Sequence, residues 1–248
     1  MARPKSPVRS EWLDPAVCSL DYRLKLIGRL PFFKHLPAEA IVHINQLFHD
    51  RDISSGQTVY FEGDEAERLY LVALGKVKLV RNTEMGRAVL LDILHGGEYF
   101  GNLPAFGRRI HTETAIALTD GCILYISSED FETILSHHPD VTRKVLEAVS
   151  QRLDESQDTI KHLSIYSVEQ RLAAVLVRLA KKLGEVRGGT VVIQLPLSRQ
   201  DLAAMTGSTT ETVSRVMSRF AEQGLIKSGR KWVTIVDEAR LEEIIKTS

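Results

Sequence analysis

Apolar and polar residues follow different spacings in successive parts of this chain. From Pro37 to Phe48, apolar residues recur at helical spacing, and a proline suits the first turn of a helix. Between Arg51 and Ser127, short runs of β-branched and aromatic residues are separated by regularly spaced glycines. The strands expected there are 58–61, 69–72, 77–80, 88–94, 114–118 and 122–126. Many short strands with glycine turns predict a β-barrel or sandwich.

The chain turns helical after Ser127. Ser127 and Asp130 have the spacing of a capping box, in which two side chains satisfy the first backbone amides of a helix. Pro139 then opens a predicted long helix that ends near Ile165. Its length of about 26 residues corresponds to roughly 39 Å.

The long helix carries a heptad pattern, because its apolar residues alternate in steps of three and four around one serine. The seam is Leu146, Val149, Leu153, Ser156, Ile160 and Leu163. Such a seam predicts contact with the same helix of a second copy. The alternative is a helix that packs on the core of its own domain. Because the seam is short, a dimer would need further contacts.

The last third of the chain predicts a helix-turn-helix followed by a hairpin. After a helix over 169–183 and a strand over 191–195, a short helix over 199–205 and a longer one over 209–223 flank a turn at Thr206-Gly207. The expected capping boxes are Ser167 with Gln170, Ser198 with Asp201, and Ser208 with Glu211. Residues 225–236 predict a hairpin, so the whole is typical of a winged helix-turn-helix.

The two faces of the longer helix differ in chemistry. Apolar residues of the helix pair face inward by their spacing: Leu202, Ala203, Val213, Val216, Met217 and Phe220. On the outer face, Arg215 can donate two parallel hydrogen bonds to guanine, and Glu211 can accept one from cytosine. The predicted DNA-contacting set is Ser198, Arg199, Ser208, Thr209, Thr210, Glu211, Ser214, Arg215 and Arg219, with Lys227, Arg230 and Lys231 of the wing against phosphate.

A different class of function would use the same elements. Glu211 and Arg215 could form a surface ion pair, since side chains four residues apart on a helix are neighbours. The chain would then be a ligand-sensing regulatory module that acts through protein partners and not through DNA.

Composition and charge narrow the class of protein. The 248 residues are 44% hydrophobic and 26% charged, as in an ordinary globular chain of two compact domains. The formal net charge is zero, but residues 167–236 hold eleven Lys and Arg against five Asp and Glu. This local excess favours a surface that binds a polyanion.

Several classes of protein are not expected. No apolar run reaches the length of about 20 residues that a membrane span needs, and the first residues lack the apolar core of a secretory signal. The two cysteines, Cys18 and Cys122, suit a reducing cytoplasm and cannot alone ligate an iron–sulfur cluster. No nucleotide-binding loop, hydrolase elbow or metalloprotease motif is present, so we expect no enzyme.

The order of β-barrel, long helix and winged helix-turn-helix resembles the Crp/Fnr family of bacterial transcription regulators over about residues 25–240. The matching segments are 59–64, 75–77, 97–101 and 207–215. The resemblance implies an α+β fold with a cyclic-nucleotide-binding-type β-roll, a homodimer, palindromic promoter DNA and RNA polymerase as a partner. The expected divisions are an N-terminal tail over 1–24, the roll over 25–136, the dimerisation helix over 137–166 and the DNA-binding domain over 167–248.

The predicted recognition helix is similar to that of the fumarate–nitrate branch of the family. Thr210 and Ser214 stand where the catabolite-activator branch has arginine and glycine. The resemblance implies that Glu211, Ser214 and Arg215 read half-sites like TTGAT.

The expected sensor departs from the family's cAMP pocket. That pocket uses a glutamate for the ribose and an arginine for the phosphate, whereas here Asn102 and the pair Thr112-Glu113 occupy those positions. An acid would repel phosphate, and Arg108 or Arg109 could replace the arginine only after a shift in register. We therefore do not expect cAMP as the effector.

The effector itself stays open at this point. Haem is one candidate, with ligands to be drawn from His35, His43, His95, His111, His162 and Cys18. Each histidine has an ordinary alternative as a hydrogen-bonded or surface residue. The expected pocket at the junction of roll and long helix is Tyr99, Asn102, Arg108, Arg109, His111, Thr112, Glu113, Ser156 and Gln157. An effector there should change how the two long helices pack, and so the spacing of the recognition helices.

Overall fold

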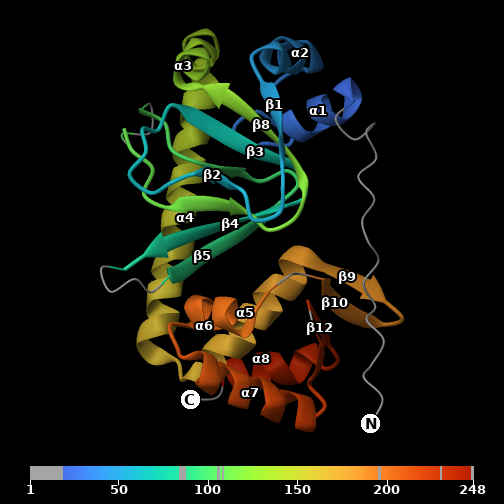
Figure 1. Cartoon of the computed structure of the whole chain (residues 1–248). Helices are drawn as coiled ribbons and strands as arrows, with labels where there is room; N and C mark the ends of the chain where they lie inside the picture. The colour runs from blue at the N-terminus through green and yellow to red at the C-terminus, as the bar shows by residue number, and fades with distance from the viewer. Residues whose placement is uncertain are drawn as a thin grey trace. The chain divides into compact units, whose positions relative to one another are not determined.

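The computed structural model describes residues 19–83, 88–104, 107, 109–194, 197–229 and 231–246. Three residues that the sequence analysis selected, Cys18, Arg108 and Arg230, lie outside the described residues. The chain forms two compact units, one mainly from residues up to Ser156 and the other mainly from Gln157 onward (Figure 1).

The first unit is a β-roll with helices at both of its sequence ends. Helices α1 (Leu20–Ile27) and α2 (Ala38–Gln46) precede the strands, and α3 (Ser128–His137) and α4 (Pro139–Ile165) follow them. The strands are β1 (His49–Ile53), β2 (Thr58–Tyr60), β3 (Arg68–Leu74), β4 (Lys76–Asn82), β5 (Ala88–His95), β6 (Tyr99–Phe100), β7 (Thr114–Ala117) and β8 (Gly121–Ser127). They form two four-stranded sheets, β1-β8-β3-β6 and β2-β7-β4-β5.

Two glycines allow the turns of the roll to pack closely. Gly75 joins β3 to β4 at a φ of +83°, and a Cβ there would lie 2.6 Å from the carbonyl oxygen of Asp120. A Cβ at Gly121 would lie 2.2 Å from the carbonyl oxygen of Leu74. Because both contacts are with backbone, neither turn has room for a side chain.

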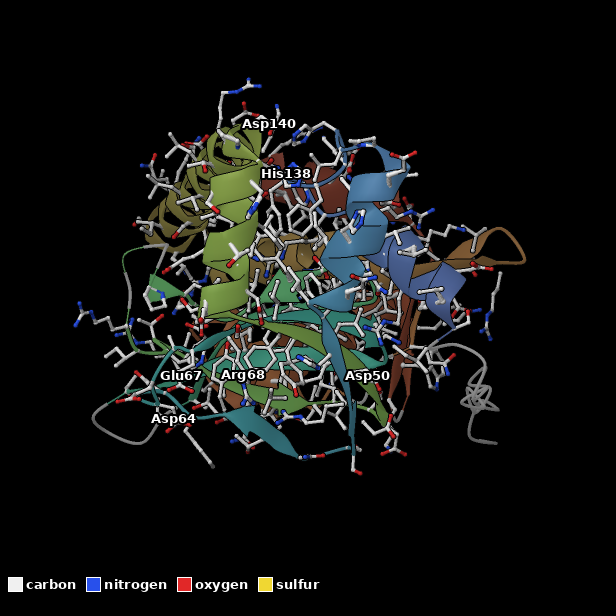
Figure 2. All side chains as sticks on the ribbon, turned by 90° about the horizontal axis from the view of Figure 1, so that it is seen from above. Asp50, Asp64, Glu67, Arg68, His138 and Asp140 are labelled. Atoms are coloured by element: carbon white, nitrogen blue, oxygen red, sulfur yellow. The ribbon has the colours of Figure 1, made fainter. Side chains whose placement is uncertain are left out.

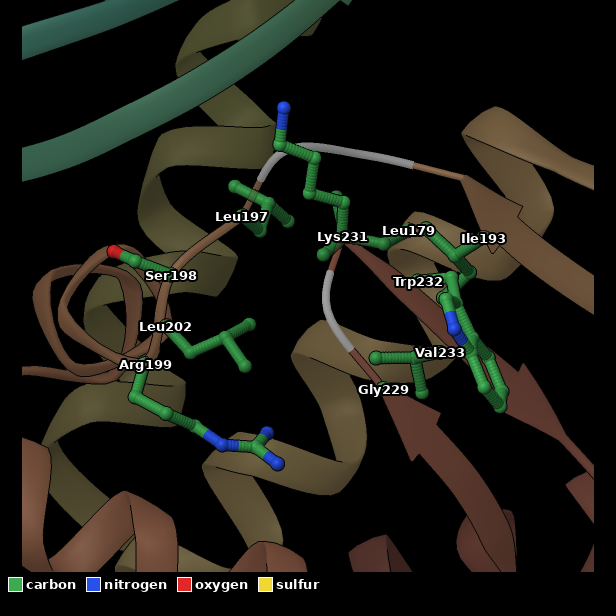
Figure 3. A pocket seen from close by; sticks show the side chains of 10 residues that line it. All are labelled: Leu179, Ile193, Leu197, Ser198, Arg199, Leu202, Gly229, Lys231, Trp232 and Val233. Atoms are coloured by element: carbon green, nitrogen blue, oxygen red, sulfur yellow. The ribbon is translucent and has the colours of Figure 1, made fainter. Parts of the chain in front are cut away.

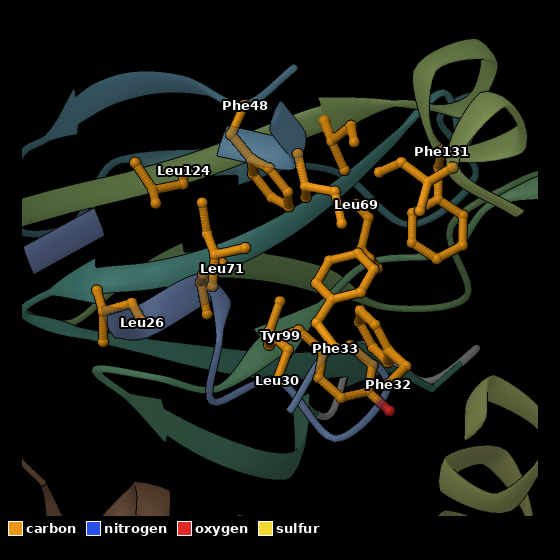
Figure 4. Packing of buried hydrophobic residues seen from close by; sticks show 14 of the residues in the cluster. Leu26, Leu30, Phe32, Phe33, Phe48, Leu69, Leu71, Tyr99, Leu124 and Phe131 are labelled. Atoms are coloured by element: carbon orange, nitrogen blue, oxygen red, sulfur yellow. The ribbon is translucent and has the colours of Figure 1, made fainter. Parts of the chain in front are cut away.

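The roll has two apolar clusters. The inner cluster joins the two sheets, with Tyr70 and Ile123 from one and Val77 and Ala115 from the other. The outer cluster lies between one sheet and the helices, where the rings of Phe32 and Phe131 meet edge to face at 5.8 Å (Figure 4). Aromatic rings are thus buried on both faces of the β1-β8-β3-β6 sheet, and their burial stabilises the roll.

The second unit is a winged helix-turn-helix. Helix α5 (Val168–Leu183) leads into β9 (Gly184–Arg187) and β10 (Thr190–Gln194). Helices α6 (Arg199–Thr206) and α7 (Thr210–Glu222) follow, then β11 (Ile226–Gly229), β12 (Trp232–Ile235) and α8 (Glu238–Lys246). One sheet of order β11-β12-β10-β9 carries the wing.

The expected α+β fold is confirmed, with five omissions. The elements not predicted from the sequence are α1, β1, β6, β9 and α8. Helix α1 crosses the boundary expected between residues 24 and 25, and its Leu26 and Ile27 are buried in the outer cluster. No described helix is long and apolar enough to span a bilayer.

Candidate nucleic-acid interface

The turn between α6 and α7 sets the direction of the second helix. Gly207 has a left-handed φ of +58°, and its amide donates to the carbonyl of Ala203 at the end of α6. Such a C-terminal glycine ends a helix without the strain that a side chain would bring. The Thr206 hydroxyl donates to the Leu202 carbonyl at 2.8 Å, so this buried group is satisfied.

The cap of α7 lies one residue later than the sequence analysis predicted. Thr209, and not Ser208, caps the helix, because its hydroxyl accepts from the Thr212 amide at 3.2 Å. The Ser208 amide instead donates to the Ala203 carbonyl, so Ser208 belongs to the turn. The expected capping box of Ser208 with Glu211 is therefore wrong, and the Glu211 side chain is left on the helix surface.

One face of α7 is core and the other is open. Val213, Val216, Met217 and Phe220 are buried, as predicted. Thr210, Glu211 and Arg215 are exposed, and Ser214 is half-buried. Within the described part of the chain, the side chains of Glu211 and Arg215 have no hydrogen-bond or ion-pair partner. Both groups are thus available, and the surface ion pair considered above is not formed.

Two other arginines of the predicted set are engaged within the domain. Arg219 donates to the Glu169 carboxylate of α5 at 2.7 Å, which ties α7 to that helix. Arg199 donates to the Ser228 hydroxyl of β11 at 3.2 Å, and burial lowers the pKa of its guanidinium. Neither is a free surface cation like Arg215.

Two of the hydroxyl residues of the predicted set, Ser198 and Thr209, are helix caps. Ser198 and Asp201 form the predicted capping box, in which the Asp201 amide donates to the Ser198 hydroxyl at 3.0 Å. The Thr209 hydroxyl likewise caps α7. These groups can still meet phosphate because Ser198 and Thr209 are exposed.

The wing presents one lysine on its first strand and one in its turn. Lys227 on β11 and Lys231 before β12 are exposed, and Lys231 has a positive φ of 68°. Gly229 is required in this hairpin, because a Cβ there would lie 2.4 Å from the indole nitrogen of Trp232. The indole is therefore packed directly on the β11 backbone.

Arg171, which was not selected from the sequence, positions the helix-turn-helix through hydrogen bonds to backbone carbonyls. Its guanidinium donates to the carbonyls of Tyr166 and Thr206, each at 2.8 Å, and more weakly to Leu163 at 3.4 Å. One side chain thus joins the end of α4 to the end of α6. The available signal was a basic residue directly after the Ser167–Gln170 capping box, which the structure confirms.

The predicted seam of α4 is an exposed apolar stripe. The side chains of Leu146, Leu153 and Ile160 are 67%, 58% and 61% exposed, and Val149 and Leu163 are exposed as well. Ser156 and Gln157 are also exposed. In contrast, Val141 and Ala148 on the same helix are buried.

The residues of the expected effector pocket do not lie together around one common site. Glu113 is buried and accepts a hydrogen bond from the Tyr60 hydroxyl at 3.0 Å. His111 is buried and stacks on the Tyr60 ring at 3.6 Å, and its Nδ1 has no partner in the described structure. Burial raises the pKa of Tyr60 far above its usual range and lowers that of His111.

The rest of that set lies at the edge of the roll. The Asn102 amide donates to the Ile110 carbonyl at 3.4 Å, Arg109 is exposed, and Thr112 donates to the Glu113 carboxylate. Tyr99 is held by α4, since Arg152 stacks over its ring at 3.9 Å and donates to its carbonyl at 2.7 Å. Burial raises the pKa of Tyr99. The structure thus brings Glu113 and His111 together but leaves Arg109, Ser156 and Gln157 outside that group.

Four of the five histidines considered for haem have partners within the chain, His111 being the exception, and Cys18 lies outside the described residues. His35 bonds to Asp140, which lies just beyond the α3–α4 junction at His138 (Figure 2). His43 bonds to the Glu39 carbonyl, His95 to the Gly96 carbonyl, and His162 stacks on Tyr166. Among the described residues, no three His, Cys, Asp or Glu side chains form a group that could hold a metal ion.

Comparison with known proteins identifies both units. A model of the Crp-like helix-turn-helix domain matches residues 170–244, and one of the cyclic nucleotide-binding domain matches residues 50–138. The chain is 30% identical to the cyclic AMP receptor protein of Thermus thermophilus over 215 residues, which is 86% of this chain and 96% of that protein.

Both branches of the family are represented among the relatives. The fumarate and nitrate reduction regulatory protein of Escherichia coli is 27% identical over 200 residues, with 81% of this chain and 80% of that protein covered. A solved CRP/FNR-family regulator from T. thermophilus has a TM-score of 0.67 at 27% identity, over 80% of this chain and 99% of that one. The chain belongs to the Crp/Fnr family of effector-regulated, DNA-binding transcription regulators.

Proposed function

We propose that this regulator is a homodimer that binds palindromic DNA with TTGAT-like half-sites. The observation that carries the proposal is the outer face of α7, where Glu211 and Arg215 are exposed one turn apart and Ser214 lies between them. Arginine matches the two acceptors of guanine, and glutamate accepts from cytosine. Since no described side chain occupies either group, a base edge can meet them without first breaking an ion pair.

The exposed seam of α4 supports the dimer. Soluble proteins seldom leave a contiguous apolar stripe in water, and Leu146, Leu153 and Ile160 are each more than half exposed in the single chain. Pairing with a second α4 would bury them in a coiled-coil contact. A twofold dimer presents two recognition helices to half-sites about one helical turn apart.

The proposed effector is not cAMP and acts where α4 meets the roll. A buried carboxylate, Glu113, stands where the family's phosphate-binding pair falls, and it is held by the Tyr60 hydroxyl. A second negative charge brought there as phosphate would be repelled. Arg152 links α4 to Tyr99 of the roll, so a ligand that moves Tyr99 would act on the dimer helix.

A gel-shift assay tests the DNA site. Wild-type protein should bind a TTGAT palindrome at least about 10³ times more tightly than a scrambled duplex at physiological salt. Arg215→Ala should weaken specific binding by about 1–3 kcal/mol. Lys227→Ala, on the wing, should instead weaken binding to both duplexes alike and reduce the salt dependence. Equal affinity of the wild type for both duplexes would refute the proposal.

A titration with cAMP tests the proposal that cAMP is not the effector. Addition of cAMP should leave both the affinity for the palindrome and the melting temperature of the protein unchanged. A ligand that binds only the folded state at a hundred times its Kd would stabilise the protein by about 2.7 kcal/mol. A stabilisation of that size by cAMP would overturn the exclusion.

A further inference from the structure

The winged-helix unit contains a cavity behind its predicted DNA-contacting surface, and Ser198, Arg199 and Lys231 belong to both the cavity lining and the predicted DNA-contacting set. It has a volume of about 360 Å³ and lies between α6, α5 and the wing (Figure 3). Its apolar lining is Leu179, Ile193, Leu197, Leu202, Trp232 and Val233. Pockets that hold small organic ligands start at roughly 300 Å³ and are mostly apolar with a few polar groups, so this one is large enough.

The apolar walls come from the core of the domain. Leu179 of α5, Ile193 of β10 and Leu202 of α6 are each almost fully buried. Figure 3 shows Leu202 and Val233 facing each other across the hollow, with the Trp232 indole at its side. The indole is held in place by its contact with the Gly229 backbone. A rigid wall of aliphatic groups and one flat ring suits an unbranched aliphatic chain.

Arg199 supplies the cationic group of the cavity. Ser198 and Lys231 also line it, but the Lys231 ammonium lies at the end opposite Arg199 and points away from the hollow (Figure 3), and none of the described lining residues is acidic. The Arg199 side chain extends from α6 toward the wing, where one of its nitrogens donates to the Ser228 hydroxyl (Figure 3). Its other donors stay available in a partly buried position, where a carboxylate gains more from a guanidinium than it does in water.

We propose that this cavity binds an unbranched medium-chain fatty acid, with its carboxylate on Arg199 and its tail against Leu202, Val233 and Trp232. An aliphatic tail matches the apolar lining, and a carboxylate matches the planar fork of the guanidinium. The proposal can be tested without DNA, so its outcome is separate from that of the gel-shift assay.

Tryptophan fluorescence of the full-length chain is the direct measurement. The chain has two tryptophans, so Trp12→Phe leaves Trp232 as the single indole, in the wall of the cavity. Hexanoate, octanoate and decanoate are titrated below their micelle concentrations. Each should change the emission in a saturable way, with affinity rising about fourfold per added methylene. Decanol should bind about tenfold or more weakly than decanoate, because it lacks the charge-assisted hydrogen bonds.

Matched variants locate the ligand. Arg199→Gln should reduce decanoate affinity to that of decanol and leave decanol binding unchanged. Val233→Phe should fill the cavity and abolish binding of both, with circular dichroism as the check that the domain is folded. Arg240→Gln removes an exposed arginine of α8 that does not line the cavity and should bind decanoate as the wild type does.

Three results would each overturn the proposal. The first is the absence of a saturable change in Trp232 emission with any of the three acids. The second is wild-type decanoate affinity in Arg199→Gln, and the third is wild-type affinity in a folded Val233→Phe. If Val233→Phe does not fold, the decanoate affinity of Arg199→Gln alone decides whether the carboxylate binds at Arg199.

Discussion

Arg171 should stabilise the DNA-binding unit more than any exposed cation of its helix. Arg171→Ala removes the guanidinium that donates to the carbonyls of Tyr166 and Thr206 at 2.8 Å and of Leu163 at 3.4 Å. The three acceptors lie at or just beyond the C-termini of α4 and α6, where unpaired carbonyls carry partial negative charge. The loss therefore affects two helix ends at once.

The expected cost follows from the geometry of the three bonds. A hydrogen bond to a charged group contributes about 1.5–3 kcal/mol when it is well formed, and only the two bonds at 2.8 Å meet that condition. The side chain is half-buried, so water replaces part of what is lost. We expect Arg171→Ala to lower the free energy of unfolding of this unit by about 3 kcal/mol. Arg171→Lys keeps the positive charge but lacks the planar guanidinium that reaches several carbonyls at once. It should lower the free energy of unfolding by about half as much.

Urea unfolding followed by Trp232 fluorescence in the Trp12→Phe background reports on this unit. Arg178→Ala is the matched control, because Arg178 is exposed on the same helix, and it should lie within about 0.5 kcal/mol of the parent. Arg171→Ala should also weaken binding to the palindrome, since the end of α6 leads directly into the turn before α7. An Arg171→Ala protein as stable as the Arg178→Ala control would refute the role assigned to this side chain.

Three further changes test other parts of the structure. Leu153→Glu, at a seam position that is 58% exposed in the single chain, should give a monomer in sedimentation with little loss of monomer stability, and a persistent dimer would contradict the seam. His111 is buried and its pKa lies below the ordinary 6.5, so the unfolded state binds more protons at mildly acidic pH and stability should fall as pH drops below about 6.5. His111→Phe, which keeps the stacking on Tyr60, should flatten that part of the stability profile, whereas His137→Gln on the exposed end of α3 should not. Gly207→Ala should cost about 1–2 kcal/mol in thermal or urea unfolding because φ is +58°, and Gly207→Asn should cost less; equal stability of Gly207→Ala and the parent would show that the turn is not strained.

Local signals in the sequence predicted the elements that are stabilised locally. The capping boxes at Ser167 and Ser198, Pro139 and the left-handed Gly207 mark helix starts and a turn that the structure contains. Each signal depends on groups within four residues of one another, so no tertiary contact is needed to interpret it. The inward and outward faces of α7 follow from its 3.6-residue period in the same way.

Strands and helices without such signals were missed. Strand β1 reads His-Asp-Arg-Asp-Ile, which has little β-propensity, and it forms because His49–Ile53 pairs with Gly121–Tyr125 of β8. Strand β6 has two residues, and β9 is an edge strand of sequence Gly-Glu-Val-Arg. Pairing with a distant segment decides β1 and β6, and a sequence read locally does not contain that information; β9 pairs with the adjacent β10 but has little β-propensity of its own.

The same division holds for the interface. The sequence by itself determined that α7 has an outer face with Glu211, Ser214 and Arg215, because the period of a helix fixes which residues share a face. Only the tertiary structure decided which cations on that unit are free: Arg219 is bound to Glu169 and Arg199 to Ser228, while Arg215 has no partner among the described residues. It also decided that Arg171 joins the ends of α4 and α6. The partners of a long charged side chain are set by the elements that pack around it, and these come from distant parts of the chain.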